Sequence, residues 1–184
     1  MQYDSKTVSR YGGSSVEALE AILTRRSIRS YRSDPVPKEL LTKVLEAGRW
    51  AASAGNSQPW TFIVVTDPEV KRRVTKGFMF GWFLDEAPAG IVICVDPRAS
   101  TCPVQDGSLA AGNMMLAAQA LGLGTCWINP GFQDNLVKEA LGIPQDQQLI
   151  CVLSLGYPAE SPTKLRKKLR DITYSEKWGN SYSR

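Results

Sequence analysis

At 184 residues, with 43% hydrophobic and 22% charged side chains, the chain has the size and composition of one soluble globular domain, residues 1–184, with a core of its own. Its formal net charge of +4 suits ligands that carry phosphate but is too small to indicate a nucleic-acid-binding protein. The chain contains no histidine, which excludes histidine-based catalytic triads and histidine-bound zinc, so we expect an organic cofactor and no metal site.

The N-terminal residues 1–13 are polar and lack the apolar core of a signal peptide, so we expect them to form a flexible or extended segment. The longest apolar run, Ala87 to Val95, is too short to span a bilayer. We therefore expect a cytoplasmic protein with no membrane partner. The cysteines are widely spaced and form no Cys-x-x-Cys pair, which favours buried free thiols over a disulfide or a metal role.

Hydrophobic periodicity and end signals predict helices and strands that intermix along the chain. A capping box at Ser14–Glu17 begins a first helix, which ends near Arg25, and Pro37 begins a second helix. The remaining predicted elements, in chain order, are a strand at Trp60–Val65, a helix at Pro68–Lys76, a buried strand at Ala89–Val95, a helix at Ser108–Leu121, a short strand at Thr125–Ile128, a helix at Leu136–Leu141 and a strand at Leu149–Leu155. This order predicts an α+β or α/β sandwich.

The helix predicted at Ser108–Leu121 is apolar nearly all round, and alanine and glycine give it small surfaces. Such a helix is buried on every side and lets another helix approach closely. We therefore expect it in the centre of the fold or at a subunit interface. The Gly122–Gly124 turn that follows fits either a ligand contact or a simple helix C-cap.

After Gly156–Pro158 the sequence becomes basic and polar, yet large apolar side chains recur as far as Trp178. Disordered tails seldom carry this many large apolar groups. The pattern predicts an extended tail that packs on another surface.

The segment RRSIRSY, residues 25–31, places three guanidinium groups beside hydroxyl side chains. Guanidinium and hydroxyl donors suit a phosphate group and the electron-rich edge of a planar heterocycle. A solvated basic helix end is the competing interpretation. A second segment, SAGNSQPW at residues 53–60, offers amide donors and acceptors in a loop before a strand, as a flavin requires, although it also fits an ordinary loop.

Together these two segments, in this order and followed by a strand, resemble the nitroreductase superfamily. AGNMMLAAQALGLGTCWI resembles the central helix and Gly-x-Gly turn of that family, and LSLGYPAE with KLRKKL resembles its final strand and basic phosphate-binding tail. The likeness extends from about Leu19 to Trp178.

The resemblance implies a three-layer α+β sandwich, in which helices flank a mostly antiparallel central sheet. It also implies an intertwined homodimer in which residues 163–184 pack on the partner subunit. The activity implied is that of an FMN-dependent oxidoreductase, with NAD(P)H as a transient reductant and a nitroaromatic, quinone or similar conjugated small molecule as the acceptor.

The resemblance also assigns residues to the cofactor. Arg25, Arg26 and Ser27 would hold the FMN phosphate and ribityl chain, and Lys164 and Arg166 of the tail would close on the phosphate. The other residues implied are Arg29 near the pyrimidine edge of the ring, Ser53, Asn56 and Gln58 from the partner subunit, and the backbone of Trp127, Ile128, Asn129 and Gly131 at the reactive edge. The flavin would carry the chemistry, with no catalytic side chain.

The physics of the ring site supports this assignment. Two-electron reduction leaves negative charge on the pyrimidine side of a flavin, so a permanently protonated Arg29 would stabilise the reduced form. No lysine after the Trp60–Val65 strand matches the second basic ring contact of some relatives, so Arg29 would act alone. Residues 78–83, rich in aromatic side chains, are a candidate acceptor lining, and a buried cluster or a dimer contact is the competing interpretation.

The sequence leaves three alternatives to this oxidoreductase activity open. Within the family these are reductive dehalogenation and oxygen-dependent breakdown of the flavin, although no segment here matches the substrate lids of those relatives. Outside it, a small basic protein could bind nucleic acid through Lys164–Arg170, but no nucleic-acid module is recognisable. No Gly-x-Gly-x-x-Gly follows a strand, so a nicotinamide would visit the flavin without a Rossmann domain.

Overall fold

The computed structural model describes residues 18–131 and 133–182 of the chain. The N-terminal segment 1–13 and the capping box predicted at Ser14–Glu17 lie outside these residues. The first helix, α1, is described over Ala18–Thr24 and ends one residue before Arg25, its expected end.

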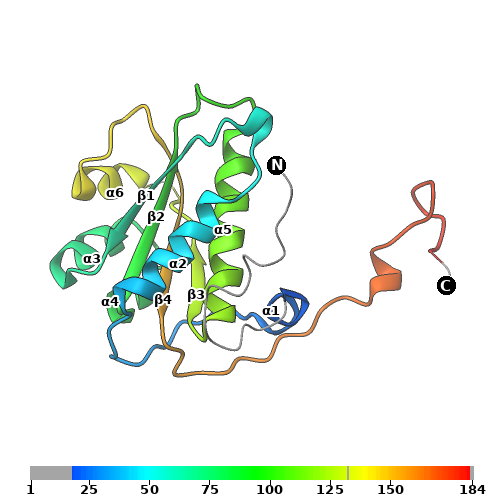
Figure 1. Cartoon of the computed structure of the whole chain (residues 1–184), viewed down its shortest axis with the longest axis horizontal. Coiled ribbons are helices and arrows are strands. Elements are labelled where there is room, and N and C mark those ends of the chain that lie inside the picture. Colours follow the sequence, from blue (N-terminus) through cyan, green and yellow to red (C-terminus); the bar gives the residue numbers. More distant parts are fainter. Residues whose placement is uncertain (1–17, 132, 183–184) are drawn as a thin grey trace, which may run out of the picture.

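One antiparallel sheet forms the middle of the described chain, with the strand order β1-β2-β4-β3 (Figure 1). Its strands are β1 (Trp60–Val65), β2 (Ala89–Val95), β3 (Gly124–Ile128) and β4 (Gln148–Gly156). Each end lies within one residue of its prediction. β3 is an edge strand, and this edge matters for the site below.

Helices cover both faces of the sheet, which confirms the three-layer α+β sandwich (Figure 1). One face carries α2 (Lys38–Arg49) and α5 (Pro103–Ala120), and α1 lies against α5. The other face carries α3 (Pro68–Thr75), α4 (Phe83–Glu86) and α6 (Asp134–Leu141). Helix α4 was not predicted, because its four residues are too few to show a period. Two short 3₁₀ turns, η2 (Ala54–Asn56) and η3 (Leu169–Asp171), lie outside these layers.

Strand β2 joins the two cores because its side chains alternate between them. Ile91 and Ile93 pack with α2 and α5, whereas Val92 and Cys94 pack with α3, α4 and α6. All seven residues of β2 are buried. The continuous apolar run in the sequence therefore reflects cover on both faces, as predicted.

Helix α5 differs from its prediction in two ways. It begins at Pro103 rather than at Ser108, because proline suits the first turn of a helix and the polar residues that follow it continue the helix. Its burial is also one-sided within a single chain: Met114 is fully buried, whereas Leu109 is 50% exposed. Within one chain α5 is therefore not buried on every side, the described residues leave part of its apolar surface exposed, and its expected place at a subunit interface stays a prediction.

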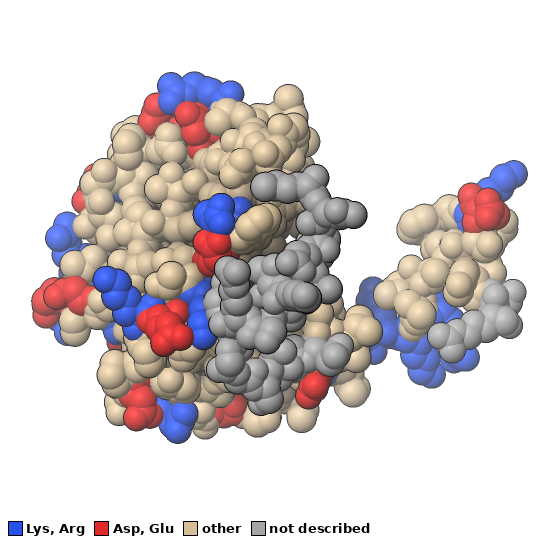
Figure 2. All heavy atoms as spheres, viewed as in Figure 1, with Lys and Arg blue, Asp and Glu red and all other residues tan. Residues whose placement is uncertain are grey.

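The C-terminal extension, residues 163–182, leads away from the sandwich (Figure 1). Leu165 is 99% exposed and Trp178 is 91% exposed, so the described residues of the chain leave these large apolar groups uncovered. Figure 2 shows basic side chains gathered along this extension, while both signs of charge mix over the visible face of the sandwich. The extension thus combines exposed apolar and cationic groups.

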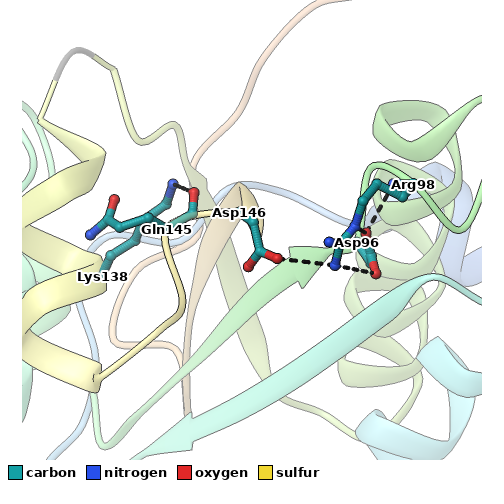
Figure 3. A network of polar contacts seen from close by, with 5 residues as sticks. All are labelled: Asp96, Arg98, Lys138, Gln145 and Asp146. Carbon is teal, nitrogen blue, oxygen red and sulfur yellow. Dashed lines mark hydrogen bonds and ion pairs between the residues drawn. The ribbon is translucent and has the colours of Figure 1, made fainter.

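A polar network fastens the end of the sheet at which β2 stops and β4 starts (Figure 3). Arg98 donates to both carboxylate oxygens of Asp96, and its Nη2 lies 3.0 Å from the Asp146 carboxylate. The hydrogen bonds from Arg98 lower the pKa of Asp96. Nearby, Lys138 of α6 donates to the Gln145 carbonyl at 3.3 Å. These contacts lie away from the site described below.

The cysteines are free thiols, as expected. Cys94, Cys126 and Cys151 are buried on β2, β3 and β4, and Cys102 is exposed. Over residues 18–131 and 133–182, no helix has both the length and the apolarity needed to cross a bilayer.

Lys71 yields a testable prediction for the fold. Its buried ammonium group donates to the carbonyls of Asp85 and Ala87 at the end of α4, and burial lowers its pKa. Lys71→Met leaves both carbonyls without this donor, so we expect the free energy of unfolding to fall by about 1–3 kcal/mol in urea titrations. Lys76→Met is the matched control and should change little, because Lys76 is exposed at the C-cap of α3, the helix that carries Lys71.

The pH dependence gives this prediction a sign. The unfolded chain keeps the Lys71 proton to higher pH than the folded chain does, so stability gains from this residue as pH rises toward the ordinary pKa of lysine. The methionine of the variant cannot titrate, and the difference in stability between parent and variant should therefore widen with alkaline pH. A constant difference would contradict the assigned pKa shift.

Candidate functional site

The chain after α1 follows an extended path along the edge strand β3. Ile28 N–H donates to the Thr125 carbonyl at 2.9 Å, and Ser27 forms a parallel bridge with Thr125. On its other side, the Ser30 carbonyl accepts a 2.9 Å hydrogen bond from Ala159 N–H. The segment is thus held between β3 and the residues after β4, where successive side chains point in opposite directions.

This alternation separates the arginines of the RRSIRSY segment. Alternation along an extended segment places Arg25, Ser27 and Arg29 on one side, and all three lower the pKa of the Cys126 thiol. Arg26 and Ile28 line a smaller hollow of about 210 Å³ on the other side. Arg26 Nη1 donates to the carbonyl of Leu23 at the end of α1 and to that of Arg25, both at 2.9 Å.

Two glycines after α5 have different roles. Gly122 has φ +75°, and its N–H donates to the Gln119 carbonyl, so it ends the helix as the C-cap interpretation predicted. Gly124 makes room: a Cβ there would lie 2.7 Å from Ile28 Cγ1. The absent side chain lets Ile28 pack against β3. It therefore sets how closely residues 25–32, which we call the cationic segment, approach that strand.

Side chains on neighbouring elements hold the same segment. The Glu160 carboxylate accepts from Arg29 N–H and, at 3.1 Å, from Ser30 N–H. The Tyr31 hydroxyl donates to the Ile28 carbonyl at 2.5 Å and lies 2.6 Å from the Ser154 hydroxyl. Burial raises the pKa of Tyr31, so this phenol stays protonated.

Arg25 and Arg166 bring two positive charges together. Burial lowers the pKa of Arg25, and the charge of Arg166 in the C-terminal extension lowers it further. Within the described ranges, neither guanidinium forms an ion pair with a carboxylate. Lys164 is exposed two residues earlier and makes no ion pair with the described residues. A pair of cations without a counterion suits a dianionic phosphate.

A cavity of about 450 Å³ opens beside Arg29 at the end of β3. It is lined by Arg29, Gly77, Met79, Phe80, Phe83, Cys126, Trp127, Ile128, Asn129, Pro130, Gly131 and Gln133. The predicted ring contacts Arg29, Trp127, Ile128, Asn129 and Gly131 therefore meet at one cavity. Its volume is within the range of small-molecule and cofactor sites, roughly 300–1,000 Å³.

The Arg29 guanidinium lies over the Phe83 ring at 5.7 Å from the centroid, which directs this charge into the cavity. The Trp127 side chain packs toward the α2 and α5 core. Burial raises the pKa of the Cys126 thiol more than Arg29 and Ser27 lower it. This thiol is therefore protonated near neutral pH and is a poor nucleophile.

The aromatic segment at residues 78–83 is divided between the two interpretations of its sequence. Phe78 and Phe83 are buried in the core beneath the cavity, as expected for a buried cluster. Met79 and Phe80 are 83% and 79% exposed and line the cavity, as expected for an acceptor lining. Gly81 makes the division possible, since a Cβ there would meet Phe78 Cβ at 2.7 Å.

The loop that carries Ser53, Asn56 and Gln58 lies elsewhere in the same chain. It contacts the N-terminal end of α5, where the Ala54 N–H donates to Asp106 at 3.0 Å. Helix α1 lies near the other end of α5 (Figure 1), and Gln119 donates to Thr24 Oγ1 there at 3.2 Å. Asp106 and Gln119 are 13 positions apart on the helix, which corresponds to roughly 20 Å along its axis. One chain therefore does not bring the two halves of the predicted site together.

Sequence reasoning gave no role to Glu160 or to Asp106. Glu160 was visible only as the last letter of the YPAE motif. Asp106 precedes the helix predicted at Ser108–Leu121, so the late start of that prediction placed it in a loop. An acidic residue just before an apolar helix was the available signal.

Comparison with known proteins is consistent with this geometry. The sequence model described as the nitroreductase family matches residues 22–82 and 76–157. A relative from Archaeoglobus fulgidus, named as an NADH dehydrogenase/NAD(P)H nitroreductase, is 41% identical over 172 residues, which cover 88% of this chain and 99% of the relative.

Two further comparisons bear on the ligand and the substrate. The crystal structure of a nitroreductase in complex with FMN from Desulfovibrio desulfuricans superposes with a TM-score of 0.82 at 30% identity, covering 89% of this chain and 98% of that one. Iodotyrosine deiodinase 1 from Rattus norvegicus is 29% identical over 194 residues, which cover 85% of this chain and 68% of the relative.

Glu160 yields a prediction that needs no ligand. In Glu160→Ala the amide hydrogens of Arg29 and Ser30 lose their acceptor, so they should exchange with deuterated solvent about tenfold faster or more. Glu160→Gln keeps an acceptor oxygen and should restore most of the protection. Glu139→Ala, at an exposed position on α6, is the control. Equal protection in all variants would show that Glu160 does not hold the segment.

Proposed function

We propose that this chain, which belongs to the nitroreductase family, is an FMN-dependent oxidoreductase that transfers a hydride from NAD(P)H to a nitroaromatic, quinone or similar conjugated acceptor. One observation carries the proposal: Arg25, which feels the charge of Arg166 and forms no ion pair with a carboxylate of the described residues, begins the segment that leads to Arg29 in the cavity of about 450 Å³.

The described residues fit an FMN molecule from end to end. Arg25 and Arg166 would bind its phosphate, and Ser27, which follows on the same side of the segment, would donate to the phosphate or the ribityl chain. Arg29 and the backbone of residues 127–131 would hold the ring. Arg26, which donates to the end of α1, would hold the segment on the side away from the ligand. Lys164 remains a proposed phosphate contact.

The chemistry that bound FMN supplies is two-electron transfer, in which a hydride taken from NAD(P)H is passed to the acceptor. Arg29 contributes a permanent positive charge where negative charge develops. Cys126 and Tyr31 keep their protons and stay neutral, so the guanidiniums supply the charge of the site. Met79 and Phe80 would cover the ring side of the cavity with exposed apolar surface, which suits a flat conjugated acceptor.

The proposed enzyme is a homodimer. Support comes from the outer face of α5 and the apolar groups of the extension, which the described residues leave exposed and which a partner surface would cover. Ser53, Asn56 and Gln58 lie roughly 20 Å along α5 from the cationic segment of their own chain, so they would reach the flavin of the partner subunit. Each flavin site would then contain residues from both chains.

Reductive dehalogenation is the second candidate, because a relative named Iodotyrosine deiodinase 1 matches most of the chain. The discriminating assay is release of iodide from iodotyrosine by the reduced holoenzyme, compared with reduction of a nitroaromatic. Iodide release at the faster rate would favour dehalogenation.

The primary test is FMN binding by the purified chain. We expect the parent to bind FMN with quenching of the flavin fluorescence and to bleach when NAD(P)H is added without air. Arg25→Ala should raise the Kd for FMN by about 10- to 100-fold, because it removes a charge-assisted hydrogen bond to phosphate. Arg73→Ala, an exposed arginine on α3, should bind like the parent. A parent chain that does not bind FMN would refute the proposal.

Arg29 should act on electron transfer more than on binding. Removing its charge in Arg29→Ala should make the two-electron potential of the flavin more negative by roughly 30–60 mV and slow its reduction by NAD(P)H. Arg29→Lys keeps the charge and should recover most of the shift. Spectroelectrochemical titration and anaerobic stopped-flow measure the two effects, and an unchanged potential in Arg29→Ala would rule out the charge role.

A further inference from the structure

Asp106 is a buried carboxylate in the first turn of α5, 3% exposed. One oxygen accepts from Ala54 N–H at 3.0 Å, and the other accepts from the Ser100 hydroxyl at 2.5 Å. In the part of the chain that the structure describes, no lysine or arginine forms an ion pair with it. The start of the helix and these two donors stabilise its charge.

A carboxylate buried without a cation is costly unless hydrogen bonds replace its hydration. The helix N-terminus and Ser100 stabilise the charge locally, within a few residues along the chain. The bond to Ala54 joins residues 52 positions apart, so besides satisfying one carboxylate oxygen it holds a second part of the chain. Its effect is on the loop at residues 53–58, which we call the amide loop.

The amide loop has a backbone that few sequences adopt unaided. Gly55, Asn56 and Gln58 have φ values of +59°, +57° and +49°, and two of these residues carry a Cβ. Such conformations are strained and persist where surrounding contacts fix them. Within the loop, Gln58 N–H donates to Ser53 Oγ at 3.0 Å. Asp106 supplies the fixed point that joins this loop to a long helix.

The amide loop also presents unused polar groups. Ser57 Oγ is buried and has no hydrogen-bond partner among the described residues. Ser53 Oγ accepts from Gln58 N–H, which leaves its own hydroxyl hydrogen free to donate. A strained loop that leaves polar groups unused is typical of a binding element.

We propose that Asp106 is a positioning residue for the FMN site of the partner subunit. It locks the amide loop in its strained shape, so that Ser53 and Asn56 meet the flavin held by the other chain. This inference rests on the proposed function. Because α5 keeps the loop far from the cationic segment of its own chain, the effect of Asp106 passes across the subunit interface and not within one subunit.

Single substitutions test the positioning role in the holoenzyme. Asp106→Ala frees the loop and should raise the Kd for FMN about tenfold or more, with a change in the visible circular dichroism of bound FMN. Asp106→Asn keeps an acceptor for Ala54 N–H and should restore both readouts. Glu139→Ala, at an exposed position on α6, is the control and should bind FMN like the parent.

Mixed dimers test the direction of the effect. The test uses a dimer of one Asp106→Ala chain and one Arg25→Ala chain. If each site combines Arg25 of one chain with the amide loop of the other, both changes fall in one site and neither falls in the other. If Asp106 acts on the partner, the mixed dimer should bind one FMN with the affinity of the parent. If it acts on its own subunit, each site is damaged once, no site of parental affinity remains, and the inference is overturned.

The outcomes separate this inference from the proposed function. A parent chain that fails to bind FMN refutes the proposed function, whereas a parent that binds FMN together with an unaffected Asp106→Ala refutes only the positioning role. If Asp106→Ala does not fold, Ala54→Pro removes the same donor and leaves the carboxylate in place; Ser53 already has the extended conformation that precedes proline. Parental affinity in Ala54→Pro would overturn the inference.

Discussion

The position of the cationic segment depends on how its backbone is paired. Residues 25–32 bond to β3 on one side and to the residues after β4 on the other, and Glu160 takes up two more N–H groups. Because the segment is extended, neighbouring arginines point in different directions. Arg29 lines the cavity, Arg25 acts on the pKa of Cys126 in the wall of the same cavity, and Arg26 donates to the end of the helix that precedes it. The spacing of charges along the proposed ligand follows from strand geometry.

Helix α5 imposes the second constraint. It runs through the length of the sandwich with the cationic segment at one end and the amide loop at the other, so a single chain keeps the two halves of the proposed site apart. The proposed dimer resolves this separation and also covers apolar groups such as Leu109 and Leu165. The same surface that hides apolar area would then complete the chemistry, which ties cofactor binding to assembly.

Features whose signal is local were predicted well from the sequence. Strands β1 and β2 match to the residue, because a continuous apolar run with turn signals at each end has one plausible structure. The start of α5 was missed because the polar residues at its first turn break the apolar pattern. In the site, Arg29 and residues 127–131 could be expected together through the family resemblance, and they do line one cavity. Asp106 and Glu160 act through backbone N–H groups distant in sequence, and no pattern in a single sequence reports such pairs.

The absence of histidine gives the site an unusual electrostatic constancy. Of the described residues that line the cavity, only Arg29 and Cys126 can titrate, and the thiol has a raised pKa because it is buried. A guanidinium keeps its charge throughout the physiological range, so the lining supplies no group that exchanges a proton readily between about pH 5 and 8. In the proposed enzyme the protons would come from water or from the reactants. The proposed enzyme would then select acceptors by their ability to take electrons and by their fit against Met79 and Phe80, and not by acid–base chemistry of the cavity lining.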